Sequence, residues 1–412
     1  MRPILHRTCW SLKAAFAGRR PKSHPEDPCL QIPRQHTKLK QCLSRKFAVA
    51  EFKGDWEWHQ RLWQMRTHWK SKQICHACRA TLNSKGNDGQ CCFVLFGSDI
   101  PRRSFEECLL VSMPDAPCPL VLVDGFHPGI IRFCAMHVLA LGIYQTLCAE
   151  ALLWLCESQV FSPMTDGMDA RLRSAYIHFK GWLRINKLSC SGRQFSCRLL
   201  HLVETDFPYL GYKAFNCRIV LAWFLMSEVQ NDLETSGRYL TASESENLYS
   251  RGQLALRFYR EAAEIFSARA QLRFQLRPKL HAMDELLRGC LCEKYNPRYF
   301  QNYSEEDVLG LLKPLAQKSV VSSARSFEVS MMKRYFLRCD LGRKKINIHI
   351  CIYACIYIVL INSIPWPGFL PIDPKMSNEA FGGRVAARSL LFTFWNHLVV
   401  LSLLYLGFGY RL

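Results

Sequence analysis

One stretch without a charged side chain, FCAMHVLALGIYQTLCA, runs from Phe133 to Ala149. The gain from removing apolar surface from water is the main favourable term in folding, so this stretch must be buried. A membrane-spanning helix needs about 20 apolar residues, and this stretch is a little shorter and contains His137 and Gln145. We therefore expect a helix in the core of the protein, with other elements packed around it.

Other segments also predict helices. Asn216–Met226, NCRIVLAWFLM, is a second apolar core segment. Thr241–Glu244, TASE, is a capping box that opens a long helix, and acidic residues at Ser304–Asp307 are typical of a helix start. A small β element is expected near Cys92–Phe96. The predicted fold class is mainly α: a helical globular core with a small Trp/Cys-rich N-terminal module and a C-terminal hydrophobic helical hairpin.

Composition divides the chain into four zones. Residues 1–45 are basic and rich in proline, which predicts a disordered arm, with an organelle transit peptide as the alternative. The other zones are a Trp/His/Cys-rich module at 46–100, a helical core at 101–342 and a hydrophobic tail at 343–412. The chain has 20 cysteines, many in apolar helical stretches, which favours buried free thiols in a reducing compartment.

The tail contains two long runs without charge, 346–364 and 389–410, each long enough to cross a bilayer as a helix. Together they predict a membrane hairpin, so the chain is expected to associate with a membrane through 346–410. The repeated Ile, Tyr and Cys of the first run are also typical of a translated nucleotide repeat. In that second interpretation the tail is foreign to the protein.

The CxxC motif Cys75–Cys78 is the usual first half of a zinc site. Cys91 and His68 are the candidates for the remaining ligands, with Cys92 and His76 as their alternatives, so zinc is the expected cofactor. The alternative is that these thiols are reduced and packed in the core.

Basic and aromatic residues alternate around the same motif. The candidate nucleic-acid contacts are Trp58, Arg61 and Arg66, which resemble a stacking platform, and Arg269, Arg273 and Arg277, which four-residue spacing would place on one helical face. A net charge of +20 also favours a polyanionic partner. The alternatives are indoles packed against a neighbouring element and a solvated basic face.

Signatures of common enzymes are absent from the sequence, including the P-loop, HExxH, GxSxG and kinase motifs. The remaining candidates for catalysis are Asp124, His127 and His137. They can equally be a turn and a core histidine, and the sequence predicts no small-molecule ligand.

Several segments resemble a large repetitive family of uncharacterised protist proteins, whose members distantly resemble degraded CACTA-type DNA transposases. The resemblance covers about residues 46–335 and rests on these segments, in this order: FKGDWEWHQRLWQMRTHWKSKQICHACRAT, HPGIIRFCAMHVLALGI, FPYLGYKAFNCRIVLAWF, RPKLHAMDELL and NPRYFQNYSEEDVLGLLKPLAQKS. Lys279, His281, Asn296, Asp307 and Gly310 match the family pattern. The resemblance implies DNA processing with acidic residues that hold a divalent metal.

One position departs from that pattern. The family has Asp-x-Met-His before the apolar helix, whereas here Cys134 takes the place of the aspartate before Met136 and His137. A thiol is a poor ligand for Mg²⁺, which prefers oxygen. We therefore expect a transposon-derived nucleic-acid-binding protein without catalysis. If it is an enzyme after all, metal-dependent DNA strand transfer is the expected reaction. The alternative is a membrane-anchored protein with a cytoplasmic helical domain. The expected location is a membrane if the tail is real and the nucleus otherwise.

The tail gives a first prediction. If residues 346–410 form a membrane hairpin, the expressed full-length chain stays in the membrane pellet after carbonate extraction, while a chain that ends at residue 342 is released. Release of the full-length chain into the supernatant would rule out the hairpin.

Overall fold

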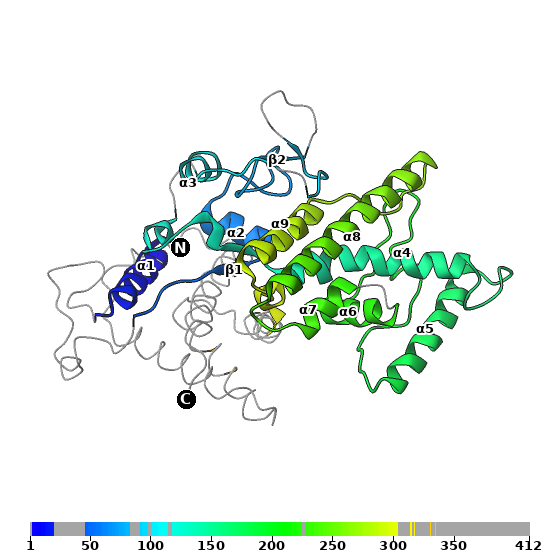
Figure 1. Cartoon of the computed structure of the whole chain (residues 1–412). Coiled ribbons are helices and arrows are strands. Elements are labelled where there is room, and N and C mark those ends of the chain that lie inside the picture. The colour runs from blue at the N-terminus through cyan, green and yellow to red at the C-terminus, as the bar shows by residue number, and fades with distance from the viewer. Residues whose placement is uncertain are drawn as a thin grey trace, which may run out of the picture. The chain divides into compact units, whose positions relative to one another are not determined.

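The structure is a computed structural model that describes residues 2–19, 46–82, 91–97, 100–113, 118–224 and 228–303, with residues 314, 317, 330 and 334. Helices dominate this part and the strands are short, so the chain is mainly α, as expected (Figure 1). Ala50–Val121 and Gly125–Asn302 form one compact unit, which crosses the expected boundary at residue 100. The expected membrane hairpin and the helix start at Ser304 lie outside the described residues.

The N-terminal segment corrects one expectation. Helix α1 (Arg2–Ala17) occupies the start of the arm that we expected to be disordered. Leu5 and Cys9, one helical turn apart, are both buried, so the segment has an apolar face. Its leucine, alanine, lysine and arginine residues also favour a helix. The basic composition concealed this local periodicity, and residues 20–45 of the arm lie outside the described residues.

The strands form two parallel pairs. Strand β1 (Phe52–Gly54) pairs with β4 (Ile131–Phe133), and β2 (Ala80–Thr81) pairs with β3 (Cys91–Cys92). Of the β element expected at 92–96, only Cys92 lies in a strand. The short helical elements nearby are α2 (Trp56–Trp63), α3 (Phe105–Glu107), η2 (Cys108–Ser112), η3 (Pro119–Leu122) and η4 (Pro128–Ile130).

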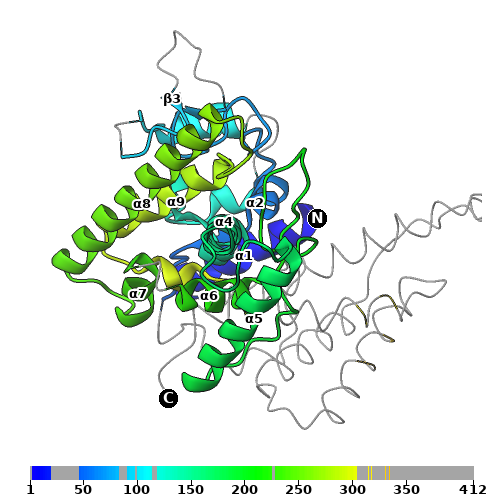
Figure 2. The ribbon, with the colours of Figure 1, turned by 90° about the vertical axis from the view of Figure 1, so that its right-hand side faces the viewer.

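The charge-free stretch forms the helix that the sequence predicts. It begins as the π-helix η5 (Met136–Ile143) and continues as α4 (Tyr144–Glu157), and we call the two together the central helix. Among the described residues it is the one helix long and apolar enough to span a membrane, yet 72% of its most apolar window is buried by the protein. Figure 2 looks almost along α4 and shows α5 (Met168–Ile185), α6 (Ala214–Trp223) and α9 (Pro278–Glu293) around it. The central helix is therefore a core helix in this structure.

The outer layer contains α7 (Glu228–Thr235), the long helix α8 (Ala242–Ala268) and the 3₁₀ turn η6 (Pro297–Phe300). The expected capping box begins α8: the Thr241 hydroxyl accepts a hydrogen bond from the Glu244 amide at 3.2 Å, and the Glu244 carboxylate accepts one from the Thr241 amide at 2.8 Å. Helix α8 packs along α9. At their contact, a Cβ on Gly252 would lie 2.4 Å from a methyl carbon of Leu287.

This close contact gives a second prediction. Gly252→Ala should lower the free energy of unfolding by about 1–3 kcal/mol, the usual cost of overpacking a core. Leu287 is buried and has little room to move away. Gly181→Ala on α5 is the matched control, because a Cβ there meets no atom within 4 Å. It should raise the free energy of unfolding by about 0.5–1 kcal/mol, since alanine favours a helix. Equal effects in denaturant unfolding curves would contradict the close packing of α8 on α9.

Candidate metal centre

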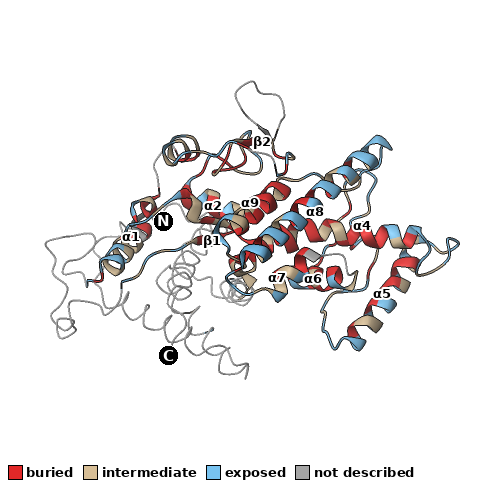
Figure 3. Cartoon of the chain, in the orientation of Figure 1, coloured by how far each residue is buried: buried red, intermediate tan, exposed pale blue. Residues whose placement is uncertain are grey.

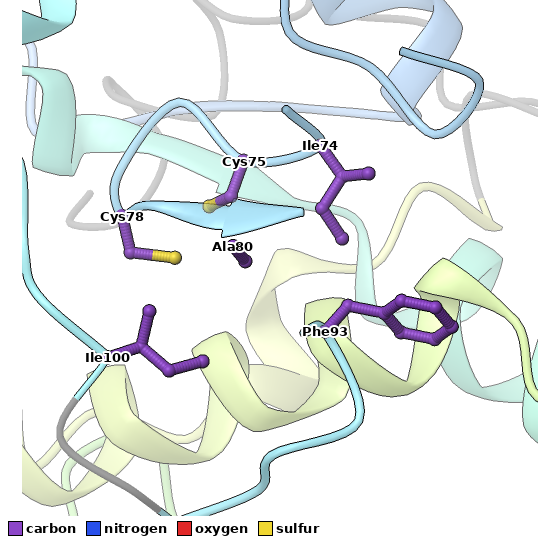
Figure 4. Packing of buried hydrophobic residues seen from close by; sticks show 6 residues of the cluster. All are labelled: Ile74, Cys75, Cys78, Ala80, Phe93 and Ile100. Atoms are coloured by element: carbon purple, nitrogen blue, oxygen red, sulfur yellow. The ribbon is translucent and has the colours of Figure 1, made fainter. Parts of the chain in front are cut away.

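The two thiols of the CxxC motif lie inside a small apolar cluster. Both Cys75 and Cys78 are fully buried, and their sulfur atoms point into the interior of the cluster (Figure 4). The cluster also contains Ile74, Ala80, Phe93 and Ile100. The thiols are therefore held away from solvent, as both the zinc and the packed-thiol interpretations require.

Backbone hydrogen bonds fix the turn that presents the thiols. The Ala77 amide donates to the Cys75 sulfur at 3.3 Å. Arg103 holds the turn from outside, because its backbone amide donates to the Ala77 carbonyl and its Nε donates to the Cys78 carbonyl, both at 3.0 Å. A sulfur that accepts an amide hydrogen bond is favoured as the thiolate, the form that binds metals.

Helix α9 supplies two further ligand groups from more than two hundred residues away. His281 and Glu285 are one helical turn apart and share a face of the helix. The His281 Nε2 atom lies 3.3 Å from the Cys78 sulfur and 3.6 Å from a Glu285 carboxylate oxygen. The ligand atoms of Cys75, Cys78, His281 and Glu285 all lie within 4.8 Å of one another.

These distances fit a single tetrahedral ion. With metal–sulfur bonds of about 2.3 Å and metal–nitrogen bonds of about 2.0 Å, neighbouring ligand atoms lie roughly 3.3–3.8 Å apart. The Cys78–His281 and His281–Glu285 separations, 3.3 and 3.6 Å, fall in that range. The other ligand atoms lie within 4.8 Å of one another, so small movements of the side chains would bring the four groups around one metal ion.

The protonation states also suit metal binding. Burial would raise the pKa of the Cys75 thiol, but hydrogen bonds from Cys78 and His281, together with the charge of the histidine, hold that pKa well below its usual value. The pKa of Cys78 is raised by its hydrogen bond to Cys75 and by burial. Burial acts to lower the pKa of His281, but its contact with Cys75 raises it overall. One thiolate is therefore favoured beside a protonated imidazole, whose proton a metal ion would displace.

Arg102 connects the cluster to solvent. Its guanidinium donates two hydrogen bonds of 2.6 Å to the two carboxylate oxygens of Glu285. The side chain of Arg102 is half exposed, whereas that of Glu285 is 10% exposed. A ligating carboxylate is commonly oriented by such a second partner, and this pair fixes the direction in which Glu285 faces the thiols.

The predicted ligands are partly brought together. Cys75 and Cys78 are in the cluster, but His68 is not, because its Nδ1 accepts a hydrogen bond from the Lys70 amide at 3.1 Å within its own turn. The side chain of Cys91 lies outside what the structure describes. Sequence reasoning missed His281 and Glu285, although a histidine and an acid four residues apart are a visible signal for a metal-binding face of a helix.

The candidates for catalysis do not assemble at this cluster. Asp124 and His127 are exposed, and His137 is half-buried in η5. The Nδ1 atom of His127 accepts a hydrogen bond from the Gly129 amide at 3.0 Å, so this residue caps η4. The group of metal-ligating side chains found among the described residues includes none of the three.

A different acidic residue lies at the edge of the β1–β4 pair. Asp55 and Cys134 follow the two parallel strands directly, and the Cys134 amide donates to the Gly54 carbonyl at 2.9 Å. The Asp55 carboxylate accepts a hydrogen bond of 2.5 Å from the Trp58 amide and caps α2. Cys134 is 1% exposed. The carboxylate of Asp55 at this edge therefore already serves as the N-cap of α2.

Lys279 lies at the same edge and makes a structural contact. Its ammonium donates to the carbonyl of Leu141, the residue at which the π-helix departs from helical geometry. Burial lowers the pKa of Lys279 to about 8, and Arg277 adds to that shift, while Asp55 and Cys134 oppose it. A Cβ on Gly142 would overlap the Lys279 side chain, so glycine makes this contact possible.

The candidate nucleic-acid residues of the N-terminal module differ in exposure. Trp58 is 7% exposed and packs in the core, so it offers no free face to a base. Arg61 is exposed but pairs with Glu57 one turn earlier. Arg66 is exposed as well. The packing interpretation of the tryptophans therefore describes Trp58 better than the stacking platform does.

The arginines at 269, 273 and 277 do not share a helical face, which corrects that expectation. Helix α8 ends at Ala268, and Ala270 and Phe274 adopt positive φ angles of 54° and 53°. Arg273 forms ion pairs with Glu150, which is 2% exposed, and with Glu157. Residues with a left-handed backbone conformation end a helix, and the four-residue spacing of the arginines does not reveal where such residues occur.

Comparison with known proteins identifies no relative: the chain matches no protein-family model, no curated protein and no solved structure. Functional arguments for this chain therefore start from its own residues.

The cluster gives a third prediction. The purified chain should contain about one metal ion per molecule, measured by elemental analysis, and Cys75→Ser and His281→Ala should each lose it. A chelator should lower the melting temperature of the wild-type chain and leave these two variants unaffected, because metal binding to a folded site adds to stability. Cys148→Ser, which alters another fully buried thiol, is the matched control and should keep the metal. A metal-free chain whose stability ignores the chelator would contradict the site.

Proposed function

We propose that the chain is a zinc-stabilised, nucleic-acid-binding protein that does not cleave its partner. The observation that supports nucleic-acid binding best is a basic stripe on α5, formed by Arg173, Lys180 and Arg184. The observation that supports zinc is the donor set of the candidate metal centre. The two parts of the proposal rest on different residues and can fail separately.

Zinc suits the donor set better than other common metals. Thiolates and imidazole select zinc, whereas Mg²⁺ and Ca²⁺ prefer oxygen ligands in larger numbers. Four protein ligands leave no open position, so the ion would be structural. Two thiolates and one carboxylate would leave the site with one negative charge, which Arg102 offsets from the protein surface. The ion would join the CxxC turn to α9.

The α5 stripe is accessible and unpaired. Spacings of seven and four residues place Arg173, Lys180 and Arg184 on one side of the helix, and all three are exposed. Within the described parts of the chain, no acidic side chain forms an ion pair with any of them. They extend over about 16 Å of helix, the length of roughly five nucleotides along one DNA strand. Cations in such a row suit a phosphate backbone, which has a negative charge at every step.

Absence of cleavage is proposed from the β1–β4 edge and the family resemblance together. Where the family has an aspartate, this chain has the buried thiol of Cys134, and the neighbouring Asp55 already caps α2. A divalent metal for phosphoryl transfer needs hard oxygen ligands that face solvent or substrate. Strand cleavage that depends on Mg²⁺ or Mn²⁺ and is lost in Asp55→Ala would overturn this part of the proposal.

The stripe gives a fourth prediction. Replacing Arg173, Lys180 and Arg184 together by alanine should weaken binding to a DNA or RNA duplex at least tenfold at low salt. It should also reduce the slope of log affinity against log salt by about 2–3, because each phosphate contact releases about one counterion. Fluorescence anisotropy across a salt series measures both quantities.

The matched control removes the same amount of charge elsewhere. Replacing the exposed residues Lys72, Arg257 and Lys294 by alanine should leave affinity and salt slope nearly unchanged. An equal loss in both triple variants would show that net charge binds the nucleic acid without a dedicated face. No binding at low salt would end the proposal.

A membrane-anchored protein is the alternative proposal. It is supported by the charge-free runs 346–364 and 389–410, which lie outside the described residues. Carbonate extraction of the full-length chain distinguishes this alternative, and its outcome does not affect the test of the α5 stripe.

A further inference from the structure

The outer side of α8 has an unusual pattern of exposed residues. Asn247, Arg251, Leu254, Phe258, Glu261 and Ile265 are spaced alternately by four and three residues, and we call this set the α8 stripe. All six are exposed, and Figure 3 shows exposed residues in pale blue along this helix. Alternating spacings of four and three are those of the contact positions in a coiled coil.

The apolar side chains of the α8 stripe are about half exposed to solvent in the single chain. Leu254, Phe258 and Ile265 are 49%, 60% and 52% exposed. Single apolar residues on a surface need no explanation, but three on one helix face, interrupted only by Glu261, favour a partner surface. The opposite side of α8 is already used, since Leu248 and Leu256 are buried.

The charges in the stripe select the partner and its direction. In an antiparallel pair of α8 helices that places Leu254 opposite Phe258 of a second copy, three residues outward on each helix bring Arg251 opposite Glu261. The two-fold symmetry repeats both contacts, which gives two apolar pairs flanked by two ion pairs. A parallel pair would instead bring Arg251 against Arg251 and Glu261 against Glu261. Like charges in contact disfavour that arrangement.

We propose that the chain forms a symmetric homodimer through antiparallel contact of its α8 stripes. A second copy suits the stripe better than nucleic acid does, because Glu261 would repel phosphate. Arg251 also pairs with Asp232 at 2.9 and 3.0 Å, and its side chain stays 43% exposed. Its guanidinium is therefore held at the edge of the stripe and remains accessible to a carboxylate from a second copy.

Charge exchange in the full-length, zinc-loaded chain tests the proposal, with the oligomeric state measured by sedimentation velocity over a range of concentrations after nuclease treatment. The wild type should show a concentration-dependent dimer, and Phe258→Glu should be monomeric. Arg251→Glu and Glu261→Arg should each weaken the dimer at least tenfold, and the double variant should restore it to within about threefold of the wild type. The Arg251–Asp232 pair is lost equally in Arg251→Glu and in the double variant, so restoration reports the contact between copies alone.

Ile177→Glu on α5 is the matched control, because Ile177 is 70% exposed and does not belong to the α8 stripe. It should leave the dimer unchanged, and melting curves of all variants should show a folded chain. A wild type that stays monomeric at all concentrations, a double variant that fails to restore association, or an equal loss in Ile177→Glu would each overturn the proposal. A monomer with a stripe covered by the chain's own hydrophobic tail falls under the first of these outcomes.

Discussion

Burial of the central helix, Met136–Glu157, is the constraint on which the rest of the compact unit depends. A helix this apolar is stabilised most when several neighbours cover its circumference, because a single neighbour covers one side. Helices α5, α6 and α9 therefore pack around it. The one acid near its centre, Glu150, is 2% exposed and receives hydrogen bonds from Arg273 and from the Phe274 amide, the latter at 2.8 Å. A buried carboxylate is tolerated only with such partners.

The candidate metal centre adds a second constraint of a different kind. Burial of the central helix positions α9, and α9 then presents His281 and Glu285 to a turn whose own apolar cluster is small. A few apolar side chains around a CxxC motif give little stabilisation, whereas a bound ion contributes directly to folding. An ion held by this cluster would join the CxxC turn, Cys75–Cys78, to α9. Arg102 and Arg103 belong to the same arrangement, since one orients Glu285 and the other holds the thiol turn.

Local signals in the sequence predicted local structure well. The capping box at Thr241 and the apolar stretch after Phe133 needed only neighbouring residues, and both are present. The spacing of His281 and Glu285 is a visible local signal, but the sequence does not connect it to the CxxC motif, because Cys78 and His281 are brought together only by the packing of α9. The prediction of a helical face through Arg273 was wrong for a related reason. Arg273 lies beyond the end of α8 and pairs with the buried Glu150. Helix propensity and the spacing of residues in the sequence do not reveal such contacts between distant parts of the chain.

Three polar residues make long-range contacts inside the compact unit. Lys279 donates to the Leu141 carbonyl, His281 faces the thiols, and the Asn296 side-chain amide donates to the carbonyls of Leu233, Ser236 and Gly237 at 3.0–3.2 Å. Each contact joins parts of the chain that are distant in sequence, and Asn296 is completely buried. These three side chains therefore help to maintain the fold. The side chain of Cys134 is buried as well, so a carboxylate at this position would have to be removed from water and would need a partner inside the core.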